Sequence, residues 1–192
     1  MKRVLVIGAF FATVVCGSHI ADAGAAGATR QRGTRPERNA NDMVTGEANR
    51  RRIEEWIGLF NRGDMASAAA FFAEDSLNNG RRVGRVDIRA VLNDIQTRFP
   101  DVKLTILNSV VEGDWVVVRC TYSGTHRGVG RLPVDGGMMV GVPATGRSFA
   151  VQHLHMFRLE NGEIKEHWAN RDDLGMIVQL GILPPPVPSA GR

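Results

Sequence analysis

The run from Ser148 to Leu159 constrains the fold more than any other feature of this chain, because it alternates two kinds of side chain. Successive side chains of a β-strand point to opposite faces of its sheet, so the run predicts a strand with one largely apolar face. Two histidines share that face with large apolar side chains. The set is Phe149, Val151, His153, His155, Phe157 and Leu159.

The two histidines make this face a candidate ligand pocket. Burying an imidazole without a hydrogen-bond partner costs about 1–3 kcal/mol, so a closed core seldom holds two of them. A ligand pocket combines apolar walls with a few polar groups. The alternative is a pair of core histidines that are hydrogen-bonded to their neighbours. We therefore take His153 and His155 as candidate catalytic residues, and Phe149, Val151 and Phe157 as candidate ligand-binding residues.

Residues 1–28 have the layout of a secretory signal peptide. Basic residues precede an apolar stretch from Val4 to Val15, and small residues beyond it offer cleavage after Ala23 or Ala28. The apolar stretch is about a dozen residues long, whereas a membrane-spanning helix needs ~20. We therefore expect an exported protein, periplasmic or secreted, without a stable membrane span.

Residues 29–46 are predicted to form a disordered linker, because they lack apolar periodicity. Much of the excess charge in the formal net charge of +4 lies in or near this stretch. The stretch has no interleaved aromatic residues and the chain has no nucleic-acid-binding motif, so we predict a solvated linker and no nucleic-acid partner. The arginines concerned are Arg30, Arg32, Arg35, Arg38 and Arg50 to Arg52.

The rest of the chain predicts one α+β domain over residues 47–183. Apolar residues from Ile53 to Phe60 have the spacing of an amphipathic helix, whereas β-branched and aromatic residues dominate after Pro100. Helices followed by an antiparallel meander imply that the helices cover one face of a curved sheet. We expect helices over 47–61, 65–73, 85–99 and 172–180, strands over 102–112, 115–126, 147–159 and 163–170, and a Pro-rich tail over 184–192.

Several stretches resemble, in the same order, the SnoaL-like polyketide cyclase family of the ester cyclase type, within the nuclear transport factor 2-like superfamily. The resemblance covers about residues 47–183. The stretches are Trp56 to Asp64 (WIGLFNRGD), Phe72 to Asp75 (FAED), Phe99-Pro100-Asp101, Gly124-Thr125-His126 with Gly128, Pro143 to Arg147 (PATGR), Asn161 to Trp168 (NGEIKEHW) and Asp172 to Gly181 (DDLGMIVQLG).

This resemblance implies a cone-shaped antiparallel sheet whose N-terminal helices enclose a central pocket. In characterised cyclases of the family, a pocket acid/base removes a proton next to a carbonyl, and the carbanion closes a ring without a metal or organic cofactor. His155 matches the family's pocket histidine, Ala169 stands at the position of its catalytic aspartate, and Asn79 corresponds approximately to a second histidine. Dimerisation is common in the superfamily, so a homodimer is expected on the same ground.

These features favour a small, largely apolar organic ligand with a carbonyl or hydroxyl group near the histidines. His155 would act as a base, with His153 as its partner, in cyclisation, isomerisation or hydrolysis. The alternative is a noncatalytic ligand-binding protein on the same fold, which Ala169 and Asn79 favour.

Four further residues complete the candidate ligand-binding set, and two of them have structural alternatives. Asp172 stands where it can cap the last helix, and Trp56 can pack in the core. The four are Trp56, Asn79, His167 and Asp172.

A metal site is the remaining alternative. His153, His155 and Glu160 are similar to the first metal motif of cupins, and imidazoles at alternate strand positions lie only ~7 Å apart. However, Glu160 immediately precedes the predicted Asn161-Gly162 turn, and no second cupin motif follows. We predict no metal and no cofactor.

Overall fold

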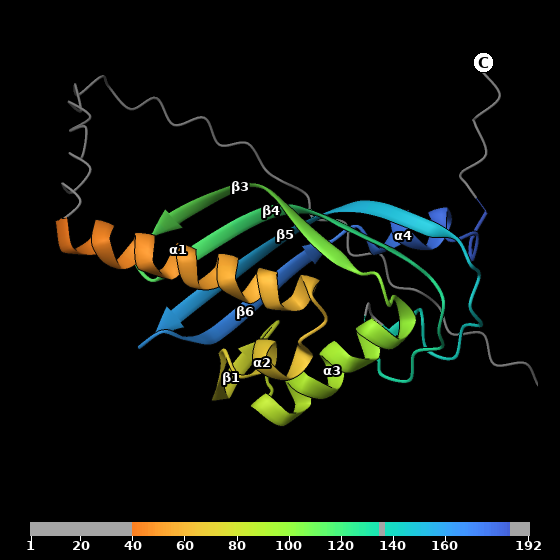
Figure 1. Ribbon diagram of the computed structural model, residues 1–192, viewed down its shortest axis with the longest axis horizontal. Coiled ribbons are helices and arrows are strands. Elements are labelled where there is room, and N and C mark those ends of the chain that lie inside the picture. Colours follow the sequence, from red (N-terminus) through yellow and green to blue (C-terminus); the bar gives the residue numbers. More distant parts are fainter. Residues whose placement is uncertain (1–39, 135–136, 185–192) are drawn as a thin grey trace, which may run out of the picture. The chain divides into compact units, whose positions relative to one another are not determined.

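The computed structural model describes residues 40–134 and 137–184 (Figure 1). The predicted signal peptide, residues 29–39 of the predicted linker and residues 185–192 of the predicted tail lie outside the described residues. In the described part, no helix has the length and apolarity needed to cross a membrane. The elements are α1 (Ala40–Asn61), α2 (Met65–Ala69), β1 (Phe72–Asn78), β2 (Arg81–Arg82), α3 (Arg85–Arg98), β3 (Lys103–Glu112), β4 (Trp115–Thr125), β5 (Ser148–Glu160), β6 (Glu163–Arg171) and α4 (Asp173–Gln179).

The strands form one curved sheet in the order β2-β1-β6-β5-β4-β3 (Figure 1). Strands β3 to β6 pair antiparallel, as their sequences predict. Strand β1, however, pairs parallel with β6, with Phe72 opposite Ile164. The α+β class is confirmed, and the prediction of a wholly antiparallel sheet is corrected at this edge.

Strand β5 confirms the predicted alternation. Its inward residues, from Phe149 to Leu159, are at most 7% exposed, whereas Leu154 and Met156 on the opposite face are 40% and 38% exposed. The two histidines therefore lie on the buried face of the sheet.

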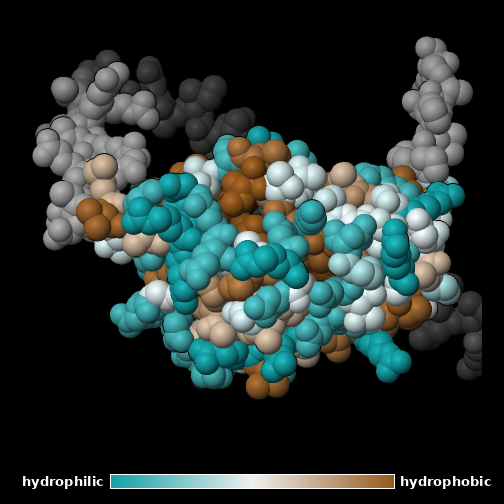
Figure 2. Space-filling view, in the orientation of Figure 1, coloured by the Kyte–Doolittle hydropathy of each residue, from teal (hydrophilic) through white to brown (hydrophobic). Residues whose placement is uncertain are grey.

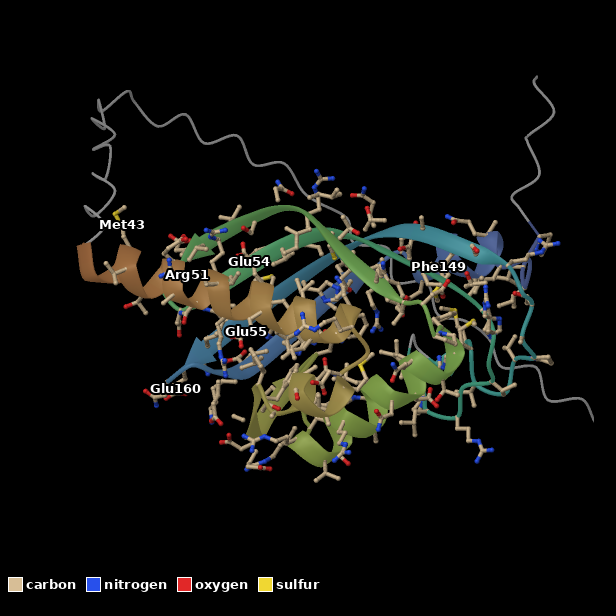
Figure 3. The ribbon with its side chains drawn as sticks, viewed as in Figure 1. Met43, Arg51, Glu54, Glu55, Phe149 and Glu160 are labelled. Atoms are coloured by element: carbon tan, nitrogen blue, oxygen red, sulfur yellow. The ribbon has the colours of Figure 1, made fainter. Side chains whose placement is uncertain are left out.

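Helices cover that buried face. Helix α1 packs on β3 and β4, and the Trp56 ring lies 5.4 Å from the Phe157 ring of β5. Helix α3 packs on β1 and on α2. Hydrophilic side chains dominate the visible surface around α1 (Figure 2), where Arg51, Glu54 and Glu55 are exposed (Figure 3).

Helix α1 begins at Ala40, although the sequence predicted a start at residue 47. Gly46 lies in the segment 29–46 that was predicted to be a linker. In the structure Gly46 is buried, and a Cβ atom at this position would lie 2.7 Å from Val111 Cγ1. Only a glycine lets the helix approach β3 this closely, so the expected linker 29–46 overlaps the helix.

The second predicted helix is too long and conceals a strand. Helix α2 ends at Ala69, and the chain enters β1 at Phe72, so residues 72 and 73 are extended rather than helical. The Phe71 carbonyl accepts a hydrogen bond from Ile164 N at 2.7 Å. This pairing with a distant segment overrides the local helix propensity.

A buried ion pair in α3 holds the segment that follows β4. The Arg98 guanidinium is fully buried, and its Nη2 lies 2.5 Å from Asp94 Oδ2 and donates to the Leu132 carbonyl. Asp94 Oδ1 accepts from Arg131 N, and the Arg98 carbonyl accepts from Arg127 N. The C-terminal half of α3 thereby holds the segment that follows β4.

Replacing Arg98 by alanine should strongly destabilise the protein. The change leaves the Asp94 carboxylate, which is 9% exposed, without its ion-pair partner. Breaking a buried ion pair costs about 3–5 kcal/mol, which urea denaturation would measure. Arg89→Ala, on an exposed position of the same helix, is the control and should cost less than about 0.5 kcal/mol. Equal losses in the two variants would contradict the role of the ion pair.

Candidate functional site

A cavity of about 460 Å³ lies between the buried face of the sheet and the helices. Small-molecule sites commonly have volumes of ~300–1,000 Å³. Trp56 and Phe60 of α1, Leu92 and Ile95 of α3 and Leu104 of β3 supply apolar walls. The polar part of the lining consists of Asn78, Asn79, Arg81, Tyr122, His153, His155, His167 and Arg171.

The three cavity histidines come from two adjacent strands. His153 and His155 lie on β5, and His167 lies on β6 opposite Phe157, so His155 and His167 are diagonal neighbours on one face. Their ring centroids are 5.2 Å apart and their ring planes differ by 13°. Two nearly coplanar imidazoles can form an in-plane hydrogen bond.

A chain of hydrogen bonds joins these two imidazoles to Asn78. His155 Nδ1 lies 2.9 Å from His167 Nε2, and His167 Nδ1 lies 3.1 Å from Asn78 Oδ1. An amide oxygen only accepts, so His167 donates from Nδ1 and its Nε2 accepts the proton of His155 Nδ1. This His155–His167–Asn78 relay leaves the lone pair of His155 on Nε2.

Three polar atoms of the lining residues are buried without a hydrogen-bond partner among the described residues. They are Trp56 Nε1, His153 Nε2 and His155 Nε2. Native proteins pair nearly all buried polar groups, so unpaired ones gathered at a cavity indicate ligand contacts. The indole N–H can donate to a carbonyl oxygen, and His155 Nε2 can accept a proton.

Burial keeps the three imidazoles neutral. It lowers the pKa of His153 to about 3, with further contributions from His155 and Arg171, and the pKa of His155 to about 4, with a further contribution from Arg171. The pKa of His167 falls well below its ordinary value, first through burial and then through His155 and Arg171. At pH 7 His155 Nε2 therefore carries a lone pair.

These lowered pKa values predict that the protein loses stability in acid. An unfolded imidazole has a pKa of about 6.5, so below that pH the unfolded chain binds protons that the folded cavity excludes. The contribution is fully present above pH 6.5 and is lost as the pH falls towards 4. His153 and His155 should each lower the unfolding free energy by about 1.4 kcal/mol per pH unit in that window.

Urea denaturation at a series of pH values would measure this slope. His153→Gln removes one titrating imidazole and should reduce the slope by about 1.4 kcal/mol per pH unit. An unchanged slope in this variant would contradict the assignment.

The cavity brings together some of the residues that the sequence nominated. His153, His155, His167, Trp56 and Asn79 line it. The other four do not.

Phe149, Val151 and Phe157 share the buried face but pack in the core outside the cavity lining. Phe149 (Figure 3), for example, lies 4.9 Å from the Phe99 ring. Asp172 caps α4, since its Oδ1 accepts a hydrogen bond from Gly175 N at 2.8 Å. The structure thus gives Asp172 the capping role that the sequence offered as its alternative.

The candidate set from the sequence did not include four polar lining residues: Asn78, Arg81, Tyr122 and Arg171. The parity of the strand predicted over 115–126 could have found Tyr122, whose ring stacks on His153 with centroids 4.5 Å apart. Arg171 lies opposite His153 and follows from the pairing of β5 with β6. Asn78 and Arg81 depend on the pairing of β1 with β6, for which no local pattern gave a signal.

Ala169 lies directly opposite His155 in the β5–β6 ladder. Its N–H donates to Asn79 Oδ1 at 2.9 Å, and Asn79 adopts a left-handed φ of 48° in the turn between β1 and β2. Asn79 therefore ties this turn to β6 as well as lining the cavity.

The residues of the cupin-like pattern do not converge. Glu160 lies at the end of β5 (Figure 3), opposite Glu163 and exposed. Over residues 40–134 and 137–184, no group of three His, Cys, Asp or Glu side chains is placed to hold a metal ion.

The chain is similar to a known protein family and to individual members of it. Residues 50–180 match the family of SnoaL-like polyketide cyclases. Aklanonic acid methyl ester cyclase DnrD of Streptomyces peucetius is 29% identical over 147 residues, which span 73% of this chain and 94% of that protein. Nogalonic acid methyl ester cyclase of Streptomyces nogalater is 27% identical over 131 residues, 65% of this chain and 91% of that protein.

A solved structure shows the same similarity in three dimensions. TsrD from Streptomyces laurentii superposes with a TM-score of 0.58 at 29% identity, covering 77% of this chain and 100% of that chain. The residues matched by the family, 50–180, include the whole cavity lining from Trp56 to Arg171.

Proposed function

The chain belongs to the SnoaL-like polyketide cyclase family, and from this premise we propose that it closes a ring in a small, largely apolar carbonyl compound by acid/base catalysis. His155 is the general base. The reaction takes place in the cavity and uses side chains of this chain alone.

The observation that carries this proposal is the buried His155 Nε2, which has no hydrogen-bond partner among the described residues and lines the same cavity as the Trp56 indole, whose N–H is also without one. The relay through His167 and Asn78 fixes the tautomer that leaves Nε2 basic. The Trp56 N–H supplies a donor for a carbonyl oxygen, where negative charge develops in the transition state.

The proposed steps conserve the proton. His155 Nε2 removes a proton from the carbon next to a substrate carbonyl, and the electron pair moves onto that carbonyl oxygen as an enolate. The enolate carbon attacks a second carbonyl of the same molecule and forms a carbon–carbon bond. The resulting alkoxide takes the proton back from the His155 imidazolium, whose Nδ1–H is held by His167.

Replacing the base tests this mechanism. His155→Gln should lower kcat by about 10²–10⁴-fold and leave ligand affinity within about tenfold, because the general base acts in the transition state. Turnover of aklanonic and nogalonic acid methyl esters, the compounds in the names of the two relatives, and of the corresponding free acids is the assay. His126→Gln is the matched control, since it removes a buried imidazole that does not line the cavity. Full activity in a His153→Gln, His155→Gln double variant would defeat the assignment.

A noncatalytic binding protein is the second candidate, and Ala169 favours it. An alanine opposite His155 cannot move a proton, whereas the family's cyclases use an aspartate at the corresponding position. In that case His155→Gln would change affinity alone, and no carbonyl compound would be turned over. Ala169→Asp separates the two functions further, because it should raise cyclase activity only if the cavity already binds a cyclisable substrate.

We also propose that the protein is exported, on the basis of the basic and apolar pattern of residues 1–28. The mature chain should then start just after Ala23 or Ala28. N-terminal sequencing of protein recovered from the extracytoplasmic fraction measures this. An intact Met1 in that fraction would contradict cleavage.

A further inference from the structure

The cavity lining is positively charged. It contains two guanidinium groups, Arg81 and Arg171, and no aspartate or glutamate among the described residues. Its three histidines are neutral at pH 7, so they do not change this balance. Asp173, which lies outside the lining, pairs with Arg171 at 3.4 Å, so one net positive charge remains, and a ligand with one negative charge would offset it.

Arg171 is the last residue of β6 and lies next to the cavity histidines in the sheet. It lies opposite His153 in the β5–β6 ladder, and its charge lowers the pKa of each cavity histidine after the larger effect of burial. Its Nε pairs with Asp173 Oδ2 at 3.4 Å, from outside the lining. A group bound to Arg171 would therefore lie close to the proposed base.

Arg81 is the second cation of the cavity lining, and its position differs from that of Arg82, the next residue of β2. It lines the cavity, whereas the adjacent Arg82 does not. Lys165 lowers the pKa of Asp75, and Arg82 adds a smaller contribution, so Arg82 has a carboxylate nearby on the surface. The two adjacent arginines of β2 thus form a matched pair, one at the cavity and one outside it.

We propose that the cavity selects a planar aromatic compound with a free carboxylate, which Arg171 binds and Arg81 attracts, rather than a neutral ester. The aromatic body would lie among Trp56, Phe60 and Leu92, which are apolar walls of the same cavity. This inference rests on the proposed function, because it places the carboxylate beside His155. It names the substrate class of that site.

The bound carboxylate would also strengthen the base. A positive charge near an imidazole disfavours its protonation, and an anion paired with that charge removes the effect. The pKa of His155, about 4 in the free protein, would rise when an acid binds and would change less with a neutral ligand. A substrate acid would thereby activate the residue that acts on it.

Isothermal titration calorimetry with 2-naphthoate and 2-naphthamide tests the selectivity, because the two probes have nearly the same shape and differ in charge. At pH 7.5 the wild-type protein should bind naphthoate at least about tenfold more tightly. Arg171→Gln should remove about tenfold of the naphthoate affinity and leave naphthamide affinity within about twofold, and Arg171→Lys should restore part of the loss. Naphthoate binding no tighter than naphthamide binding, including no binding of either, would overturn the inference.

The arginines of β2 provide the internal control. Arg81→Gln should weaken naphthoate binding by about threefold, whereas Arg82→Gln should leave it unchanged. Equal losses in both variants would show attraction by the overall charge alone and would also overturn the inference. Because neither probe is turned over, these outcomes are independent of whether His155 acts as a base.

Titration of the imidazoles by NMR gives a second readout. Saturation with naphthoate should raise the His155 pKa above its value in the naphthamide complex. The same pKa in both complexes would place the carboxylate away from Arg171.

Discussion

The hydrogen bond between His155 Nδ1 and His167 Nε2 is the interaction on which the candidate site depends. It fixes the tautomer of both rings because Asn78 Oδ1 accepts from the far side of His167. Without it, His155 could carry its proton on Nε2 and could not act as a base at that atom. The bond crosses from β5 to β6, so the pairing register of these two strands also determines the chemistry.

Two buried imidazoles, His153 and His155, and the half-buried His167 destabilise the fold, and the packing around them has to compensate. Each neutral ring loses its hydration, and Nε2 of His153 and of His155 finds no partner among the described residues. Aromatic contacts offset part of this cost. The Tyr122 ring stacks on His153, and the ring centroids of Phe157 and His167 lie 4.8 Å apart. The same low-polarity surroundings that make the cluster costly make a bound carbonyl group easier to polarise.

The sequence predicted those parts of the fold and site that depend on local periodicity. The alternation along β5 placed His153 and His155 on one buried face, and the helical spacing before Asn61 predicted the helix whose Trp56 lines the cavity. The sequence did not predict β1, because this strand depends on parallel pairing with β6, which is far away in the sequence. Asn78 was missed for that reason, and with it the tautomer of the relay. Asp172 shows that proximity in sequence does not make a residue part of the site. It follows the cavity residue Arg171 in the chain, but its carboxylate caps α4 and does not line the cavity.

The methyl group of Ala169 changes the charge balance of the cavity as well as its chemistry. A carboxylate at this position, opposite His155 and two residues before Arg171 on the same face of β6, would neutralise an arginine and stabilise an imidazolium. With alanine there, no lining residue of the described chain supplies that negative charge. The imidazoles are neutral at pH 7. Asp173 pairs with Arg171 from outside the lining, so Arg171 and Arg81 leave one net positive charge at the cavity. A substrate that carries its own carboxylate would supply the missing charge at the moment of binding, which links recognition of the ligand to the basicity of His155.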